Sequence, residues 1–357
     1  MELLSSTVAV TVDCNLFRGK THVNPVSRLV EPIANAIEHG KAEKVDVMME
    51  RAGLPVGLVF SVTESGGVGM GAKEVADAIR FGHHAAKASG GETLANYSHN
   101  GIGTKACLNF FSRLAIFSVQ QQAEGGRGYV LLLLDVADKL GDGQCQPARR
   151  IVWSDGASGE PDWGANACSE VCQELFYLPP TQRNVTAGVA AEFQKIGGAG
   201  TRMVYFGNEG REETSEAGKM FVLAGSDVRV HPGALASGVA QHGAKENTCP
   251  LYVTSLRQRL RHFLADPSVV KLSLNGVAVE ACGAYRLFEA IDEKLPPAVD
   301  KLGVVGRGEG AVIDASSLEI TVGPEEAPFR ATLRMGRSDR NQVRLEIIRT
   351  ARIVMTK

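Results

Sequence analysis

The alternation of apolar and polar positions along the chain predicts a protein of the α/β class. Val8, Val10 and Val12 alternate with small or polar residues, which is typical of a strand near the N-terminus. Helical spacing of apolar residues predicts helices that follow Asn24-Pro25, cover 73–81 and 254–264, and begin at 104. Apolar runs between these segments predict further strands at 44–50, 56–63, 114–119, 129–136, 148–153, 203–206 and 269–274.

The first helix is predicted to start at Asn24-Pro25 and to end at His39-Gly40. Asparagine caps helix N-termini, proline suits the first turn, and glycine commonly follows a helix end. Pro32 lies inside this helix, where it removes one hydrogen bond and costs about 3 kcal/mol unless the helix kinks. We therefore expect a local distortion beside Glu31. The apolar face consists of Val26, Leu29, Val30, Ile33 and Ile37.

Three short segments carry the candidate chemistry. Glu31 and Asn35 stand four residues apart, so on a helix they share one face, one turn apart. Glycine turns follow apolar runs at 64–70 and 100–106, where backbone can approach a ligand closely. A carboxylate, an amide and two glycine turns in this order could hold a metal-bound nucleotide and place a base beside it.

These segments resemble the Bergerat-fold (GHKL) ATPases, and within that family most closely the MORC branch. Residues 17–40 are similar to the ATP-site helix of that branch, and residues 67–82 to its adenine turn with the following helix. Residues 197–208 resemble the strand that opens its transducer domain. Residues 255–280 resemble its Ser-Leu-Arg helix followed by a basic strand and turn.

The resemblance implies two domains. An ATPase domain over 1–180 would be an α/β sandwich with a mixed sheet, and the LPPTQRN stretch would mark its end. A smaller α/β transducer domain of the ribosomal-S5-like kind would occupy 181–357. The segment 82–99 lacks apolar periodicity, which is expected of a mobile lid.

By resemblance, Glu31 is the general base that activates water for attack on the γ-phosphate of ATP, and Asn35 is the ligand of Mg²⁺. The adenine turn would contain Gly67, Gly69 and Met70. The family has an aspartate two residues before Gly67, where this chain has Ser65, and we expect Glu64 to point to the opposite face. Losing that charge-assisted bond costs about 1–2 kcal/mol, so ATP binding should be weak and Ser65→Asp should strengthen it.

The second glycine turn resembles the phosphate turn of the family, at which a helix starts and backbone amides bind anions. Lys105 would add a positive charge near the phosphates, and Lys87 would reach them from the lid. Ser98 replaces the leading glycine of the family. His83 and His84, at the start of the lid, are interpreted as solvated. The turn consists of Asn100, Gly101, Ile102, Gly103, Thr104 and Lys105.

Composition narrows the class of protein. The net charge of −2 predicts no global attraction to nucleic acid. Among seven cysteines only Cys168 and Cys172 are close, which favours reduced thiols over a zinc site. No leader and no apolar run of about 18 residues stand in the sequence, so no membrane span is expected. A nuclear location follows from the resemblance, and a cytoplasmic one otherwise.

Basic residues gather in two places. Arg257, Arg259, Arg261, His262 and Lys271 would form a stripe that contacts nucleic-acid phosphates without sequence preference, although solvated helix and strand faces explain them equally well. The tail from 327 to 357 holds eight Arg and Lys against Asp339 and Glu346. By resemblance, a basic residue near the end of the transducer reaches the γ-phosphate, and the candidates are Arg349, Arg352 and Lys357.

The expected function is an ATP-gated clamp of the MORC type that forms a homodimer with nucleotide, hydrolyses ATP slowly, and acts on DNA or chromatin. The alternative is a degenerate pseudo-ATPase that serves as a dimerisation or interaction scaffold. Ser65, Ser98 and Pro32 favour this alternative because they depart from the family within the site motifs. A chaperone or mismatch-repair relative of the same superfamily is the third interpretation.

Overall fold

The computed structural model describes most of the first 280 residues and four later strands. All structural statements below concern these residues. They are 4–8, 25–38, 41–52, 57–79, 103–122, 125–136, 148–154, 173–175, 177–178, 185–207, 220–232, 234, 254–263, 270–280, 313–322, 329–337, 343–349 and 352–356.

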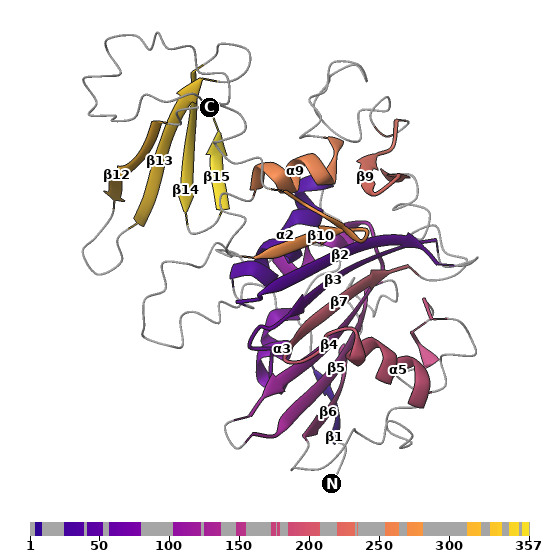
Figure 1. Ribbon diagram of the computed structural model, residues 1–357. Coiled ribbons are helices and arrows are strands. Elements are labelled where there is room, and N and C mark those ends of the chain that lie inside the picture. Colours follow the sequence, from indigo (N-terminus) through magenta and orange to yellow (C-terminus); the bar gives the residue numbers. More distant parts are fainter. Residues whose placement is uncertain are drawn as a thin grey trace, which may run out of the picture.

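A nine-stranded mixed sheet forms the body of the protein (Figure 1). The strand order is β1-β6-β5-β4-β7-β3-β2-β10-β11, and all neighbours are antiparallel except β2 and β10. With helices on the sheet, the chain belongs to the α/β class with a mixed sheet, as expected. The strands are β1 (Leu4–Val8), β2 (Lys44–Arg51), β3 (Leu58–Ser65), β4 (Arg113–Gln121), β5 (Arg127–Asp135), β6 (Ala148–Ser154), β7 (Gly200–Phe206), β10 (Lys271–Leu274) and β11 (Val277–Ala278).

The sheet crosses the domain boundary that the sequence suggested near residue 180. Strand β7 lies in the middle, between β4 and β3, and its central residue Met203 pairs with both Ile116 and Val62. Strand β10 pairs with β2 in parallel. The prediction that residues 197–208 open a second domain is therefore wrong, because β7 completes the first sheet.

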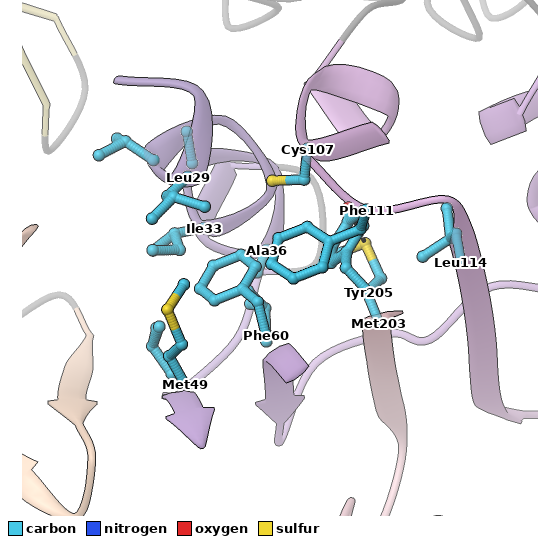
Figure 2. Packing of buried hydrophobic residues seen from close by; sticks show 14 of the residues in the cluster. Leu29, Ile33, Ala36, Met49, Phe60, Cys107, Phe111, Leu114, Met203 and Tyr205 are labelled. Carbon is cyan, nitrogen blue, oxygen red and sulfur yellow. Dashed lines mark hydrogen bonds between the residues drawn. The ribbon is translucent and has the colours of Figure 1, made fainter. Parts of the chain in front are cut away.

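One face of the sheet is covered by helix α2 (Pro25–Glu38), helix α3 (Ala72–Ile79) and the 3-10 helix η3 (Gly103–Asn109). Leu29 and Ile33 of α2 are fully buried, as are Phe60 of β3 and Tyr205 of β7. Figure 2 shows these side chains packed together, with Cys107 and Phe111 closing the core beside α2. Helix α2 runs without interruption across Pro32, where a distortion was expected.

The opposite face is covered by α5 (Val185–Gln194) and contains a buried ion pair. Arg202 Nε of β7 donates to Glu192 Oε2 of α5 at 2.7 Å, and Lys195 also pairs with Glu192. The Arg202 guanidinium donates further to the hydroxyls of Ser61 and Thr63. Because these donors surround a carboxylate that is almost fully buried, the pair fixes α5 to the sheet.

The Ser-Leu-Arg motif has a structural role at α9 (Leu256–Phe263). The Ser255 hydroxyl accepts from the Gln258 amide, which makes it the N-cap, and it donates to Asp227 Oδ2 at 2.7 Å. Leu256 is fully buried in the core that includes α2. Arg257 donates to carbonyls of Ser226, Leu274, Val277 and Ala278. The motif thus joins α9 to the β10–β11 hairpin and to the β8–β9 hairpin (Phe221–Ala224 and Asp227–Val230).

The later part of the chain contributes a separate sheet. Strands β12 (Ile313–Val322), β13 (Phe329–Arg337), β14 (Val343–Arg349) and β15 (Arg352–Thr356) form an antiparallel meander, drawn in yellow in Figure 1. Strand β15 contacts α9, and α9 contacts α2. Within the described residues, no helix is long and apolar enough to cross a membrane.

The contacts of Arg257 predict a specific loss of stability. Arg257→Ala removes a charged donor shared by several carbonyls, so it should lower the free energy of unfolding by about 2 kcal/mol. Chemical denaturation measures this change. The exposed Lys271→Ala is the control and should change it by less than about 0.5 kcal/mol. Equal effects of the two variants would show that the carbonyl contacts do not stabilise the hairpin.

Candidate functional site

Helix α2 carries Glu31 and Asn35 beside its apolar stripe. Both side chains are partly buried, while Val30, Ile33 and Ala34 next to them are buried against the sheet. The packing of this stripe fixes the rotation of the helix about its own axis. The two polar residues therefore lie at the border of the core, on the side of α2 that meets η3.

Asn35 connects the first segment to the second glycine turn. Its Nδ2 donates to Thr104 Oγ1 of η3 at 3.4 Å, across a separation of 69 residues. Tyr205 of β7, which is fully buried, donates its hydroxyl to the Thr104 carbonyl at 2.7 Å. The start of η3 is thus held both from helix α2 and from strand β7.

Glu64, and not Ser65, faces this side of the sheet. Side chains alternate along a strand, and Phe60 and Val62 of β3 belong to the core beneath α2. Glu64 continues that series, whereas Ser65 follows Val59 toward the α5 face. Ser65 therefore points away from the face that carries Asn35 and Thr104. Counting alternate residues along β3 from Phe60 identifies Glu64 as the residue on this face.

Glu64 lies in a small polar cluster at the ends of three strands. Its carboxyl accepts a hydrogen bond from the hydroxyl of Thr201 on β7. Ser118 Oγ of β4 lies 3.2 Å from Thr201 Oγ1 and accepts from the Met70 amide at 2.6 Å. Burial raises the pKa of Glu64 to about 7. At neutral pH the carboxyl is therefore partly protonated and can both donate and accept a hydrogen bond.

The first glycine turn is pressed against the protein backbone. Gly69 has φ +66°, and a Cβ placed there would lie 2.0 Å from the Val119 carbonyl oxygen. At Gly200 a Cβ would lie 2.3 Å from the Glu64 carbonyl oxygen. These glycines permit the close approach that places Met70 over Ser118 and β7 beside β3. Met70 packs at the border of the core, and Gly67 is partly buried.

Lys105 points away from the role that the sequence suggested for it. Its Nζ donates to the Ala78 carbonyl at 3.0 Å, in the last turn of α3, and the residue is 2% exposed. Burial lowers the pKa of Lys105 to about 7. A lysine amine bound to a helix C-terminus is stabilised there, and it adds no charge to the phosphate turn in this arrangement.

The donor set matches a magnesium nucleotide in part. The Asn35 amide nitrogen is bonded to Thr104, so its carbonyl oxygen is the atom suited to Mg²⁺, a cation that prefers oxygen. Glu64 and the Met70 turn provide the polar and apolar groups that a purine needs. Among the described residues, no group of three His, Cys, Asp or Glu could hold a metal ion by itself. Mg²⁺ would thus be held through Asn35, phosphates and water.

Several predicted residues cannot be placed. Lys87, Asn100, Gly101 and Ile102 lie outside the described residues, as do His83, His84, Ser98, Cys168, Cys172 and Lys357. Gly103 is the first residue of η3. Arg349 and Arg352 face each other across the β14–β15 turn, and their backbone positions are described.

Comparisons with known proteins identify no family. The sequence matches no model of a known protein family, and a search among well-characterised proteins gives no significant match.

The raised pKa of Glu64 predicts a pH-dependent stability with a definite sign. Since the folded protein keeps this proton up to about pH 7 and the unfolded chain loses it near pH 4.5, stability falls as pH rises between these values. Glu64→Gln removes the charge, so it should raise the free energy of unfolding at pH 8 by up to about 3 kcal/mol. Near pH 4.5 the difference from wild type should vanish.

Denaturation at several pH values measures this profile. Glu74→Gln is the matched control, because Glu74 lies on the exposed side of α3. A parallel pH dependence for wild type and Glu64→Gln would mean that Glu64 titrates normally.

Proposed function

We propose that this protein is a GHKL-type ATPase of the MORC kind, which binds ATP with Mg²⁺ and acts as a nucleotide-gated dimerising clamp on DNA or chromatin. The main support is the hydrogen bond between Asn35 and Thr104. It joins the two motifs for which the sequence suggested a metal-nucleotide role, on the sheet face that also carries Glu64. A nuclear location belongs to the same proposal.

In this proposal, Glu31, Asn35 and Thr104 have different roles, which follow from their positions. Glu31 lies one turn before Asn35 on α2, so a water beside the Mg²⁺-bound phosphates could give its proton to the Glu31 carboxylate. Mg²⁺, when bound, would neutralise the phosphate oxygens. Asn35 would orient the metal and Thr104 would fix the backbone of the phosphate turn. Phosphoryl transfer depends chiefly on such positioning, so this small set of groups is chemically sufficient.

The base would bind at the polar cluster of Glu64. The adenine amino group is a donor, and the Glu64 carboxyl can accept from it in either protonation state. Met70 offers an apolar surface for the ring, and its amide is already bonded to Ser118. Glu64 thus replaces Ser65 in the proposed binding set, and the weak binding expected from a serine no longer follows.

The clamp part of the proposal involves α9 and the second sheet, which lie outside the proposed nucleotide site. Helix α9 contacts both α2 and β15, so a shift of α2 could reach the second sheet. In this proposal that sheet would belong to the transducer, and it contains the basic tail residues Arg349 and Arg352. Arg257 is bonded to backbone carbonyls, so a nucleic-acid contact would use Arg259, Arg261 or the tail instead.

A pseudo-ATPase scaffold remains the second candidate, and one observation favours it. Lys105, the positive charge nearest to the Thr104 turn in sequence, is bonded to α3 and has a lowered pKa. A phosphate turn without this charge binds anions through backbone amides alone. The scaffold would retain the fold and the dimer surface while losing turnover.

Glu31→Ala separates turnover from binding. It should lower the ATPase rate at least about hundredfold, because a general base is removed, and leave nucleotide-dependent dimerisation intact. Phosphate release and light scattering with a non-hydrolysable analogue measure the two properties. Glu74→Ala serves as the control, with both properties unchanged. Loss of neither property in Glu31→Ala would contradict the clamp.

Glu64→Ala and Ser65→Ala test which neighbour recognises the base. Losing the Glu64 acceptor should weaken the binding of an ATP analogue about tenfold, whereas Ser65→Ala should change it less than about twofold. Calorimetric titration with Mg²⁺ measures both affinities. If Ser65→Asp instead strengthened binding, the serine would be the residue at the base. No saturable binding by the wild type would leave the scaffold as the function.

A further inference from the structure

Cys107 contacts the backbone of α2 one turn before the proposed catalytic base. Its Sγ donates to the carbonyl oxygen of Arg28 at 3.4 Å, across 79 residues of sequence. Cys107 is fully buried on η3, and Figure 2 shows its sulfur directed toward α2. Burial raises the pKa of this thiol well above its usual value, so the proton that it donates stays on the sulfur.

The acceptor is the carbonyl that Pro32 affects most. In an α-helix the carbonyl of residue 28 accepts from the amide of residue 32, and proline has no amide hydrogen. The proline ring also presses on the same carbonyl. Helix α2 nevertheless continues through Pro32 to Glu38. The thiol of Cys107 therefore donates to the carbonyl for which Pro32 lacks the usual amide donor.

Glu31 lies inside this modified turn. A residue that precedes proline is disfavoured in the helical conformation, because the proline Cδ crowds its amide and Cβ. The charges of Arg28 and Glu31 both act on Cys107, which places the three groups in one neighbourhood. Whatever keeps the turn from 28 to 32 helical also sets the direction of the Glu31 side chain.

We propose that Cys107 is a positioning residue for Glu31: its bond to the Arg28 carbonyl replaces the one that Pro32 removes and holds the intervening turn. The part that concerns catalysis rests on the proposed ATPase function. The structural part, the thiol in place of the missing amide, does not depend on any activity.

A double-mutant cycle tests the structural part. Cys107→Ala should lower the folding equilibrium constant by roughly threefold to tenfold more in wild type than in a Pro32→Ala background, where the helix regains its own donor. Urea denaturation measures the four proteins. Val75→Ala, which truncates a buried residue of α3 in the same core, is the matched control and should cost the same in both backgrounds. Equal costs for Cys107→Ala in both backgrounds would overturn the proposal.

Cys107→Ser provides a second test if the alanine variant does not fold. Serine keeps a donor, so with Pro32 present Cys107→Ser should cost less stability than Cys107→Ala, and it should still fold if the alanine variant does not. In the Pro32→Ala background, where the helix supplies its own donor, the serine variant should no longer be more stable than the alanine variant. A serine variant that is no more stable than the alanine variant with Pro32 present would contradict the replacement of one bond by another.

Steady-state kinetics test the catalytic part. Cys107→Ala should lower kcat about tenfold with KM for ATP within twofold, and Pro32→Ala in the same chain should restore kcat. If Cys107→Ala lowered kcat only through a general loss of packing, Pro32→Ala would not restore kcat. If Cys107→Ala and Pro32→Ala are coupled in stability but Cys107→Ala leaves kcat unchanged, only the positioning role is refuted. If the wild type has no ATPase activity, the proposed function is refuted. The stability cycle then still tests whether the Cys107 thiol replaces the missing amide donor.

Discussion

The apolar face of the nine-stranded sheet must be covered, and α2 is the helix that covers its centre. Leu29 and Ile33 on the helix meet Phe60 and Tyr205 on the strands, in a core without exposed area at these residues. Burial of this kind is the main favourable term in folding. Because the apolar stripe of α2 faces the sheet, Glu31 and Asn35 lie at the border of the core, and the hydrogen bond between Asn35 and Thr104 depends on this rotation of the helix.

Polar groups complete the same face at the ends of the strands. Glu64, Thr201 and Ser118 lie next to the core residues Val62, Met203 and Ile116 on β3, β7 and β4, so this end of the core is formed by a carboxyl and two hydroxyls. Burying an ionisable group costs stability, which the raised pKa of Glu64 reflects. Proteins often accept such a cost at sites that bind or react, and under the proposed function this cluster would lower stability in return for binding the base.

Local sequence patterns predict most helices and strands. The features that they do not predict depend on contacts between residues distant in the sequence. Helix α2 begins at Pro25 as its capping signal predicted, and the apolar runs became β2 to β6 within a few residues. The motif comparison selects Ser65, whereas the alternation along β3 places Glu64 on the face beneath α2. The bond from Lys105 to the Ala78 carbonyl at the end of α3 cannot be predicted from the local sequence, because the two residues lie 27 positions apart. The place of β7 depends on pairing with two strands distant in sequence, which composition and periodicity do not encode.

The central position of β7 bears on how the chain is made. During synthesis β3 and β4 are complete by residue 121, but the strand that joins them, β7, ends at Phe206. Until then both neighbours present unpaired backbone and apolar surface to solvent. Pairings this distant along the chain slow folding and prolong exposure to aggregation. A nascent chain that stops near residue 180 would therefore have two half-sheets with unpaired edges, and about 26 more residues must be added before β7 can join them.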